Sequence, residues 1–351
     1  MLPCADGLYD LRGILMPRPC SGGGMASYTR IVADADMDGL CAAAVLKRLH
    51  PKAEVMFAHP ALVRSGHLDE HIDRSTVMVD LPFHPACGWY VDHHQTNKPD
   101  PEEAARFLAE GGRLDWADAP SAARVAYDLV APSHPMPHLE PMMPFVDALD
   151  SGGITREAFL DDGPMVRLSR CLGLINEGFM QHVLQLLVNG AGLEALLADK
   201  AVADALEQAG KDRESDLARV REHTTVTDGL AVCRLDGRDG RVSGYLVTAH
   251  VGAKADACCI IHGHVDGSID RADRPALSAS FYANSFHEGR RRLDLSRLAT
   301  LLDPTGGGHA NACGCRVVAL DAAGNPEDRP VRADDVERNL EAWMKLWRAW
   351  R

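Results

Sequence analysis

Residues 28–49 read YTRIVADADMDGLCAAAVLKRL, and this stretch decides the fold. The β-prone run from Tyr28 to Ala33 predicts a buried strand, and Gly39 to Leu49 carries apolar residues at helical spacing. The turn between them holds three aspartates at alternate positions: Asp34, Asp36 and Asp38. The stretch therefore predicts a strand, an acidic turn and a helix in immediate succession.

The same alternation continues along the first half of the chain. Further strands are predicted at 55–58, 77–81 and 89–92, and helices at 121–130 and 144–149. Alternating strands and helices favour an α/β fold with a parallel sheet and helices on both faces. In such sheets ligands bind at the carboxyl ends of the strands, where the acidic turns fall.

The second half has a different pattern. A polar stretch at about 190–222 predicts a helical connector, and a β-rich region follows with runs at 230–237, 241–251 and 276–283. A glycine-rich turn, a strand at 316–320 and a helix at 333–350 end the chain. We therefore predict an N-terminal extension, a larger α/β domain, a connector and a smaller α/β domain, with bounds 1–25, 26–190, 191–225 and 226–351.

Composition narrows the classes of function. The 351 residues carry a formal net charge of −13, which disfavours binding of long duplex nucleic acid but not of a small phosphorylated ligand. No apolar run is long enough to suggest a membrane span. The ten cysteines lack the spacing of a zinc site, and we expect them to be reduced, small apolar residues of a cytoplasmic protein.

Four clusters carry the candidate chemistry. Besides the aspartates at 34, 36 and 38, they are Asp80, which closes VMVD, then Asp92-His93-His94, and a segment with two aspartates, Asp147 and Asp150. Each alone is also typical of a helix cap or a turn. Together, at successive junctions of one predicted sheet, they offer oxygen and nitrogen ligands for two divalent cations, the arrangement that serves displacement at phosphorus.

In this order, DADMDG, VDL, VDHH and ALDSGG resemble the motifs of the DHH phosphoesterase superfamily, and residues 304–314, PTGGGHANACG, resemble the GGGH signature of its associated C-terminal domain. The resemblance implies that Asp36, Asp38, Asp80, His93 and Asp150 bind metal, with Asp147 as the alternative to Asp150. It implies that His94 faces the substrate and that Asp92 orients the histidines. Some relatives have a histidine where this chain has Val32; here Asp34 is the candidate to compensate.

The resemblance also places substrate binding in the second domain. Glycines at 306–308 let the backbone approach a phosphate, and His309 can donate to it. The densest basic run follows Gly289, so Arg290 and Arg291 are candidate phosphate ligands, with a solvated charged turn as the alternative. An arginine that relatives often carry just after the serine-bearing strand is absent from LSASFYANSF.

The sequence thus predicts a phosphoesterase that hydrolyses short oligonucleotides or small nucleotides with two divalent cations, Mn²⁺ foremost and Mg²⁺ or Co²⁺ as alternatives. The alternatives are hydrolysis of polyphosphate or pyrophosphate, and a nucleotide-binding sensor without activity. No membrane partner is expected, and a homodimer is left open.

Overall fold

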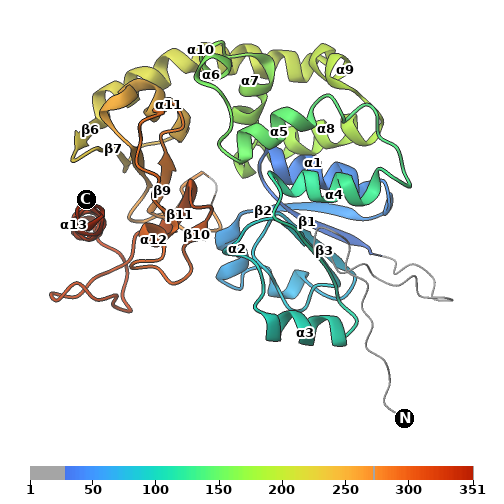
Figure 1. Ribbon diagram of the computed structural model, residues 1–351, viewed down its shortest axis with the longest axis horizontal. Coiled ribbons are helices and arrows are strands. Elements are labelled where there is room, and N and C mark those ends of the chain that lie inside the picture. Colours follow the sequence, from blue (N-terminus) through green and yellow to red (C-terminus); the bar gives the residue numbers. More distant parts are fainter. Residues whose placement is uncertain (1–27, 272, 351) are drawn as a thin grey trace.

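The computed structural model describes residues 28–271 and 273–350, so the predicted N-terminal extension and two cysteines, Cys4 and Cys20, lie outside the described residues. In the described part the chain forms two sheets (Figure 1). The first has five parallel strands in the order β2-β1-β3-β4-β5. They are β1 (Arg30–Asp34), β2 (Glu54–Ala58), β3 (Thr76–Val79), β4 (Trp89–Asp92) and β5 (Arg113–Trp116).

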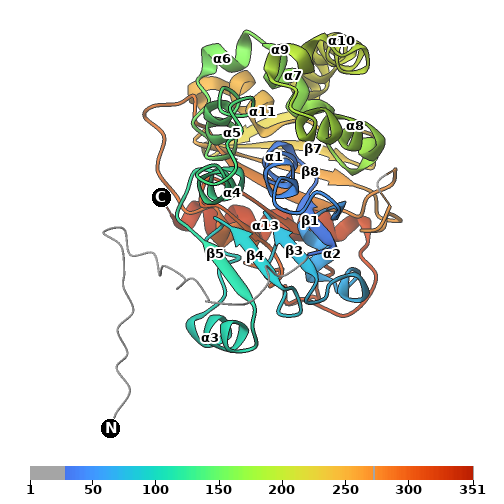
Figure 2. The same cartoon turned by 90° about the vertical axis from the view of Figure 1, so that its right-hand side faces the viewer.

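Alternate side chains of this sheet face two separate cores, as the strand period of two requires. Ile31 and Ala33 pack with α1 (Met37–Lys47), α4 (Ala122–Val130), α5 (Met143–Asp150) and α8 (Glu177–Val188). Val32 faces the other way, toward α2 (Pro60–Arg64), a short 3-10 turn η1 (Asp69–His71) and α3 (Pro101–Ala109). The predicted parallel sheet with helices on both faces is confirmed (Figure 2).

A helical layer joins the two sheets. It contains α6 (Arg156–Leu160), α7 (Pro164–Cys171), η2 (Leu174–Asn176), α9 (Leu193–Ala198) and the long α10 (Lys200–His223). At ~1.5 Å per residue, α10 extends for roughly 36 Å, and Figure 1 shows it running over the top of the molecule from one half to the other. α9 and α10 occupy the stretch predicted as a connector.

The second sheet is mixed, with six strands in the order β10-β11-β9-β8-β7-β6. They are β6 (Thr224–Thr227), β7 (Leu230–Asp236), β8 (Ala257–Gly263), β9 (Ser278–Ala283), β10 (Gly307–Gly308) and β11 (Ala312–Arg316). One face packs on α12 (Ser296–Ala299) and α13 (Ala333–Ala349), the other on α10 and α11 (Gly244–Val251), which η3 (Gly252–Lys254) follows.

Two predictions for this half are wrong. The apolar run at 241–251 forms α11 instead of a strand, because Ser243 caps it by accepting from the N–H of Tyr245. The strand expected at 316–320 lies earlier, in β11, because Cys313 and Cys315 supply the apolar side of the alternation. The helix predicted at 333–350 is confirmed by α13.

The eight cysteines of the described part are buried and unbridged, as expected of small apolar residues. None of the helices in residues 28–271 and 273–350 combines the length and apolar character that a bilayer span requires.

Candidate metal centre

The acidic turn after β1 begins the centre. Asp36 caps α1, and its Oδ1 accepts from the N–H of Gly39 at 2.9 Å. A Cβ at position 39 would lie 2.3 Å from the carbonyl oxygen of Asp34, so only glycine lets the helix start this close to the strand. The turn thereby holds Asp34 and Asp36 beside Asp80, with one oxygen of each within 4.8 Å of the others.

Asp38 lies deeper, one residue inside α1. Its two carboxylate oxygens each accept a hydrogen bond of 2.7 Å, from the N–H groups of Ala122 and Ala123 at the start of α4. A helix N-terminus favours a carboxylate, because its first N–H groups lack partners within the helix. The packing of α4 against α1 therefore fixes how Asp38 is oriented.

Asp80 follows β3 with a φ of 60°, in the left-handed region that few residues other than glycine adopt. Its Oδ1 is buried without a hydrogen-bond partner, 3.8 Å from Nε2 of His93 and 3.6 Å from Nδ1 of His94. A strained backbone that aims an unsatisfied carboxylate oxygen into a cluster is typical of a functional site.

Asp92 ends β4 and is hydrogen-bonded to both histidines. Its Oδ1 accepts from Nδ1 of His94 at 2.9 Å and from the N–H of His93 at 2.8 Å. Its Oδ2 accepts from the hydroxyl of Tyr90 at 2.6 Å and the amide of Asn97 at 3.0 Å. Burial would raise the pKa of Asp92, but the charge of His94 and these hydrogen bonds hold it below its usual range.

The two histidine rings point in different directions. Nδ1 of His93 lies 3.0 Å from the carbonyl of Ala119, to which it can only donate, so Nε2 keeps its lone pair for the cluster. That Nε2 is buried without a hydrogen bond, 3.2 Å from Asp150 Oδ2 and 3.5 Å from Asp38 Oδ2. Burial lowers the pKa of His93, which keeps the ring neutral and able to bind a metal.

The pKa of His94 is shifted in the opposite direction from that of His93. Burial alone would lower its pKa, but the charge and hydrogen bond of Asp92 raise that pKa to about 9. Its ring stacks on His309, with centroids 4.2 Å apart and an interplanar angle of 20°.

Asp150, at the end of α5, completes the cluster. Its Oδ2 is buried and unpartnered, and it faces His93. The alternative, Asp147, is engaged elsewhere: its carboxylate accepts from Ser121 at 2.7 Å and from Arg124 at 2.7 and 3.0 Å. Asp150, and not Asp147, therefore contacts the cluster.

The glycine-rich turn brings a residue of the second half of the chain, His309, into contact with this cluster. Nε2 of His309 lies 3.5 Å from Asp150 Oδ2, and the His309 ring centroid is 4.7 Å from that of His93. Thr96, two residues after His94, bonds both backbone groups of Gly308: its hydroxyl donates to the carbonyl at 3.1 Å and accepts from the N–H at 3.0 Å. His309 was predicted as a substrate ligand, yet it lies among the predicted metal ligands.

The turn requires glycine at these positions because neighbouring backbone and side-chain atoms leave little or no room for a Cβ. A Cβ on Gly306 would lie 2.3 Å from the carbonyl of Ala299, and one on Gly307 would lie 2.9 Å from Nη2 of Arg64. Gly308 has a φ of 130°.

The predicted arginines are not brought to the cluster. Nε of Arg291 donates to Asp256 at 2.7 Å, and its guanidinium lies over the ring of Trp347 at 4.9 Å. Nη1 of Arg290 reaches the carbonyl of His287 at 3.5 Å. Among the described residues neither arginine contacts a member of the centre, and Arg291 packs against α13 instead.

The centre fits divalent cations. Four buried ligand atoms have no hydrogen-bond partner: Asp80 Oδ1, His93 Nε2, Asp150 Oδ2 and His309 Nε2. Burial, and then neighbouring carboxylates, raise the pKa values of Asp34, Asp38 and Asp80, and raise that of Asp36 to about 6. So many carboxylates close together are stable as anions only when cations neutralise them, and mixed oxygen and imidazole ligands suit Mn²⁺ or a similar ion.

Val32 does not take part, since it is fully buried in the core on the opposite side of the sheet. Asp34 stands instead among the candidate ligands, beside Asp36 and Asp80, as the compensation hypothesis requires.

The fold agrees with known structures. The pGpG-specific phosphodiesterase PggH from Vibrio cholerae superposes with a TM-score of 0.59 over 92 % of this chain and 99 % of its own, at 20 % identity. The DHH domain of a member of a ribosomal-protein family gives 0.50 over 92 % and 86 %, at 13 % identity. The chain has a DHH-type fold.

RecJ from Thermus thermophilus, solved with Mn²⁺, gives a TM-score of 0.46 over 91 % of this chain and 52 % of its own, at 16 % identity. No family model matches the sequence, and no curated protein is significantly similar to it. The superpositions on PggH and on the DHH domain confirm the motif-based resemblance at the level of the fold.

Sequence reasoning missed Arg64, Thr96 and Asn97, which link the DHH-type centre to the glycine-rich turn. Only the nearness of Thr96 and Asn97 to the double histidine could have indicated a role.

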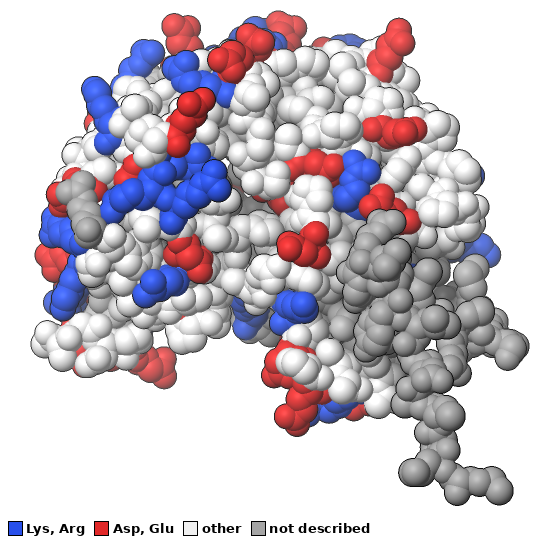
Figure 3. Space-filling view, in the orientation of Figure 1, with Lys and Arg blue, Asp and Glu red and all other residues white. Residues whose placement is uncertain are grey.

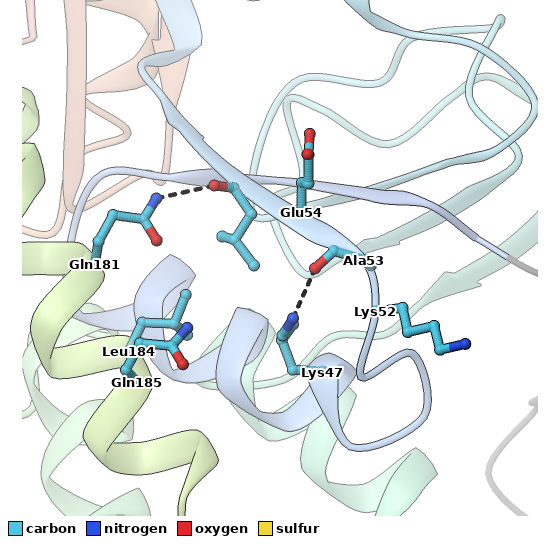
Figure 4. Close-up of a pocket in the computed structure, with 8 residues that line it drawn as sticks. Lys47, Lys52, Ala53, Glu54, Gln181, Leu184 and Gln185 are labelled. Atoms are coloured by element: carbon cyan, nitrogen blue, oxygen red, sulfur yellow. Dashed lines mark hydrogen bonds between the residues drawn. The ribbon is translucent and has the colours of Figure 1, made fainter.

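A separate cavity of about 450 Å³ lies between α1, β2 and α8 (Figure 4). There Gln181 donates to the carbonyl of Val55 and Lys47 to that of Ala53, so these polar groups are already satisfied.

Proposed function

We propose that this protein is a hydrolase of phosphoester bonds that depends on divalent cations, with short oligonucleotides or small nucleotides as substrates. The observation that carries the proposal is the convergence of nine carboxylate and imidazole side chains, four of which have a buried ligand atom without a hydrogen-bond partner. The fold it shares with the pGpG phosphodiesterase supports a short linear dinucleotide as the first substrate to test.

The side chains have distinct proposed roles. Asp34, Asp36, Asp38, Asp80, His93 and Asp150 would hold two cations, and His309 is close enough to join them or to contact the substrate. Bound cations would supply Lewis acidity toward water and phosphoryl oxygens. We propose Mn²⁺ as the native ion because the ligands are carboxylates with imidazole.

His94 would act on the substrate. Asp92 holds the ring by Nδ1, which leaves Nε2 to donate a proton or hydrogen bond to a phosphoryl or leaving-group oxygen. Asp92 positions the ring and has no lone pair directed at the substrate, since both its oxygens are engaged.

Chelation tests the proposal. Chelator-treated protein should not hydrolyse pGpG, and Mn²⁺ should restore turnover better than Ca²⁺, which prefers more oxygen ligands and a looser geometry. A parallel panel of cyclic dinucleotides, 3′-phosphoadenosine 5′-phosphate, pyrophosphate and polyphosphate ranks the substrates. Full activity in excess chelator would contradict the metal centre, and turnover of pyrophosphate or polyphosphate alone would contradict the nucleotide preference.

A further inference from the structure

The last turn of α5 ends at Asp150, and its carbonyl groups need donors that the helix itself does not supply. The carbonyl of Asp147 accepts from the N–H and from the hydroxyl of Ser151, and that of Ala148 accepts from a backbone N–H further along the chain. In the described part of the chain no backbone N–H donates to the carbonyl of Leu149. The peptide group that joins Leu149 to Asp150 therefore needs a donor from elsewhere.

Tyr245, in the second half of the chain, supplies this donor. Its hydroxyl donates to the carbonyl of Leu149 at 2.9 Å, across 96 positions of sequence. Burial, and then the charge of Asp150, raise the pKa of Tyr245, so the hydroxyl keeps its proton and remains a donor. Because a peptide group is planar, a bond to this carbonyl also restrains the backbone nitrogen of Asp150.

Neighbouring groups fix the Tyr245 ring independently of its hydroxyl. Tyr245 lies in the first turn of α11, where Ser243 caps the helix by accepting from its N–H at 3.2 Å. The centroid of its ring lies 5.6 Å from that of Phe159 in α6 and 5.7 Å from that of Phe286. These ring contacts do not involve the hydroxyl, so the packing and the hydrogen bond can be separated by substitution.

Asp150 needs such support more than other members of the centre. Two backbone N–H groups orient Asp38, and the carbonyl of Ala119 orients His93, whereas Oδ2 of Asp150 has no hydrogen-bond partner. Metal ligands are generally oriented by hydrogen bonds from neighbouring groups, and loss of such a group weakens metal binding. The position of the Asp150 carboxylate therefore depends on its backbone, and so on the contact at the carbonyl before it.

The contact belongs to the junction of the two halves. Figure 3 shows the surface notched at its lower edge between the halves, so they do not touch along the whole of their facing sides. An apolar cluster joins α5 and α6 to α11, with Phe159 from the first half and Val247 from the second. Apolar packing is not directional, and the Tyr245 hydroxyl adds a directed bond to it.

We propose that Tyr245 is a positioning residue of the metal centre, whose hydroxyl holds the peptide group before Asp150 and thereby orients that carboxylate. The inference rests on the proposed function, because it takes Asp150 as a metal ligand, and it gives the second half of the chain a part in binding the cation. That half then acts on Asp150 twice: through the Tyr245 hydroxyl, and through His309, whose Nε2 lies 3.5 Å from Oδ2.

Tyr245→Phe tests the proposal, since it removes the hydroxyl and keeps the ring contacts. Calorimetric titration of metal-free protein with Mn²⁺ should show the affinity for one ion lowered about three- to tenfold, as expected for one neutral hydrogen bond that acts through the backbone. In turnover of pGpG, the Mn²⁺ concentration that gives half the maximal rate should rise by a similar factor. At saturating Mn²⁺, kcat should stay within about twofold of wild type, because the ligand itself is retained.

Tyr28→Phe is the matched control. Its hydroxyl also donates to a backbone carbonyl, that of Gly88 at 3.3 Å, but it lies at the amino ends of the strands, away from the centre. This variant should bind Mn²⁺ as wild type does. Asp150→Asn, which removes the charged ligand, should weaken binding of the same ion by more than Tyr245→Phe does.

A hydroxyl that only stabilises the packing of α11 against α5 would give a different result. Metal-free Tyr245→Phe would then unfold at a lower temperature while its Mn²⁺ affinity equalled that of wild type, and an unchanged affinity overturns the proposal at any unfolding temperature. If Tyr245→Phe binds Mn²⁺ more weakly but the wild type hydrolyses no phosphoester, the proposed function fails and the positioning role stands. Absence of Mn²⁺ binding by the wild type would overturn both.

Discussion

At the scale of the residue, Asp80 combines an unfavourable backbone conformation with a side-chain oxygen that has no hydrogen-bond partner. Its φ of 60° is costly for an aspartate, and its Oδ1 is buried without a hydrogen bond. Neither feature stabilises the apoprotein. Both would be accounted for by our proposal that the two cations share Asp80, because their binding free energy would offset the strain.

We expect Asp80→Asn to lower kcat at least about 100-fold with Mn²⁺ present, since the amide removes the charge at the shared position. Asparagine tolerates the left-handed conformation, so the fold should persist, as circular dichroism and thermal unfolding would show. Asp118→Asn, at an exposed aspartate near the same strand ends, is the control and should keep wild-type turnover. A kcat within tenfold of wild type would exclude the bridging role.

The adjacent histidines should separate in metal content. His93→Ala removes a lone pair that faces the cluster, so elemental analysis should find that the variant has lost an ion. His94→Ala should keep both ions and turn over slowly, because the Asp92 hydrogen bond holds that ring for the substrate. The opposite pattern of metal loss would reverse the two assignments.

At the scale of the element, the glycine-rich turn depends on one carboxylate. Asp303, almost completely buried, accepts from the N–H and hydroxyl of Thr305 and from the backbone and guanidinium of Arg316. It thereby ties the start of the turn to β11. Burial would raise the pKa of Asp303, but the hydrogen bonds of Arg316 and Thr305 lower that pKa to about 2.

A carboxylate whose pKa is lower in the folded state stabilises the fold above its unfolded pKa and loses that effect as the pH falls through the folded value. We therefore expect Asp303→Asn to lower the free energy of unfolding by about 2 kcal/mol at pH 7. The difference from wild type should shrink between roughly pH 4 and pH 2. Denaturant titration across this range measures it, with exposed Asp328→Asn as control; a difference independent of pH would refute the electrostatic account.

At the scale of the whole molecule, the two halves meet at polar contacts around the centre and at an apolar cluster that joins α5 and α6 to α11. His309 stacks on His94, and Thr96 bonds both backbone groups of Gly308. α10, in the helical layer, connects the two halves along the top of the molecule in Figure 1. The position of His309 at the cluster therefore depends on contacts of modest individual strength.

Thr96→Val removes both hydrogen bonds to Gly308 while keeping the shape of the side chain. Because net hydrogen bonds contribute about 1 kcal/mol each, kcat/KM should fall roughly three- to thirtyfold. Thermal stability should change little, since Thr96 is exposed. Thr227→Val, at an exposed threonine of β6, is the matched control. An unchanged kcat/KM would show that the Thr96 contact does not hold His309 in place.

The sequence determined much of the first half. The period of two in Ile31, Val32 and Ala33, and the acidic residues at each strand end, follow from local patterns. A parallel sheet brings those ends to one edge, so Asp36, Asp38, Asp80 and His93 converge through topology alone, whereas Asp150 reaches them from the end of α5. The order of the motifs along the chain was enough to predict this convergence, because every strand in the sheet has the same direction.

Only the tertiary structure decided what the second half contributes. No local pattern could place His309 against Asp150, or Arg64 under Gly307, since these pairs lie more than a hundred residues apart and meet through packing. Nor could the basic run at Arg290 and Arg291 indicate its own surroundings, because the contacts of Arg291 with Asp256 and Trp347 arise only in the fold. Sequence reports which charges a chain carries; which of them lack a partner depends on the side chains that the fold places around each one.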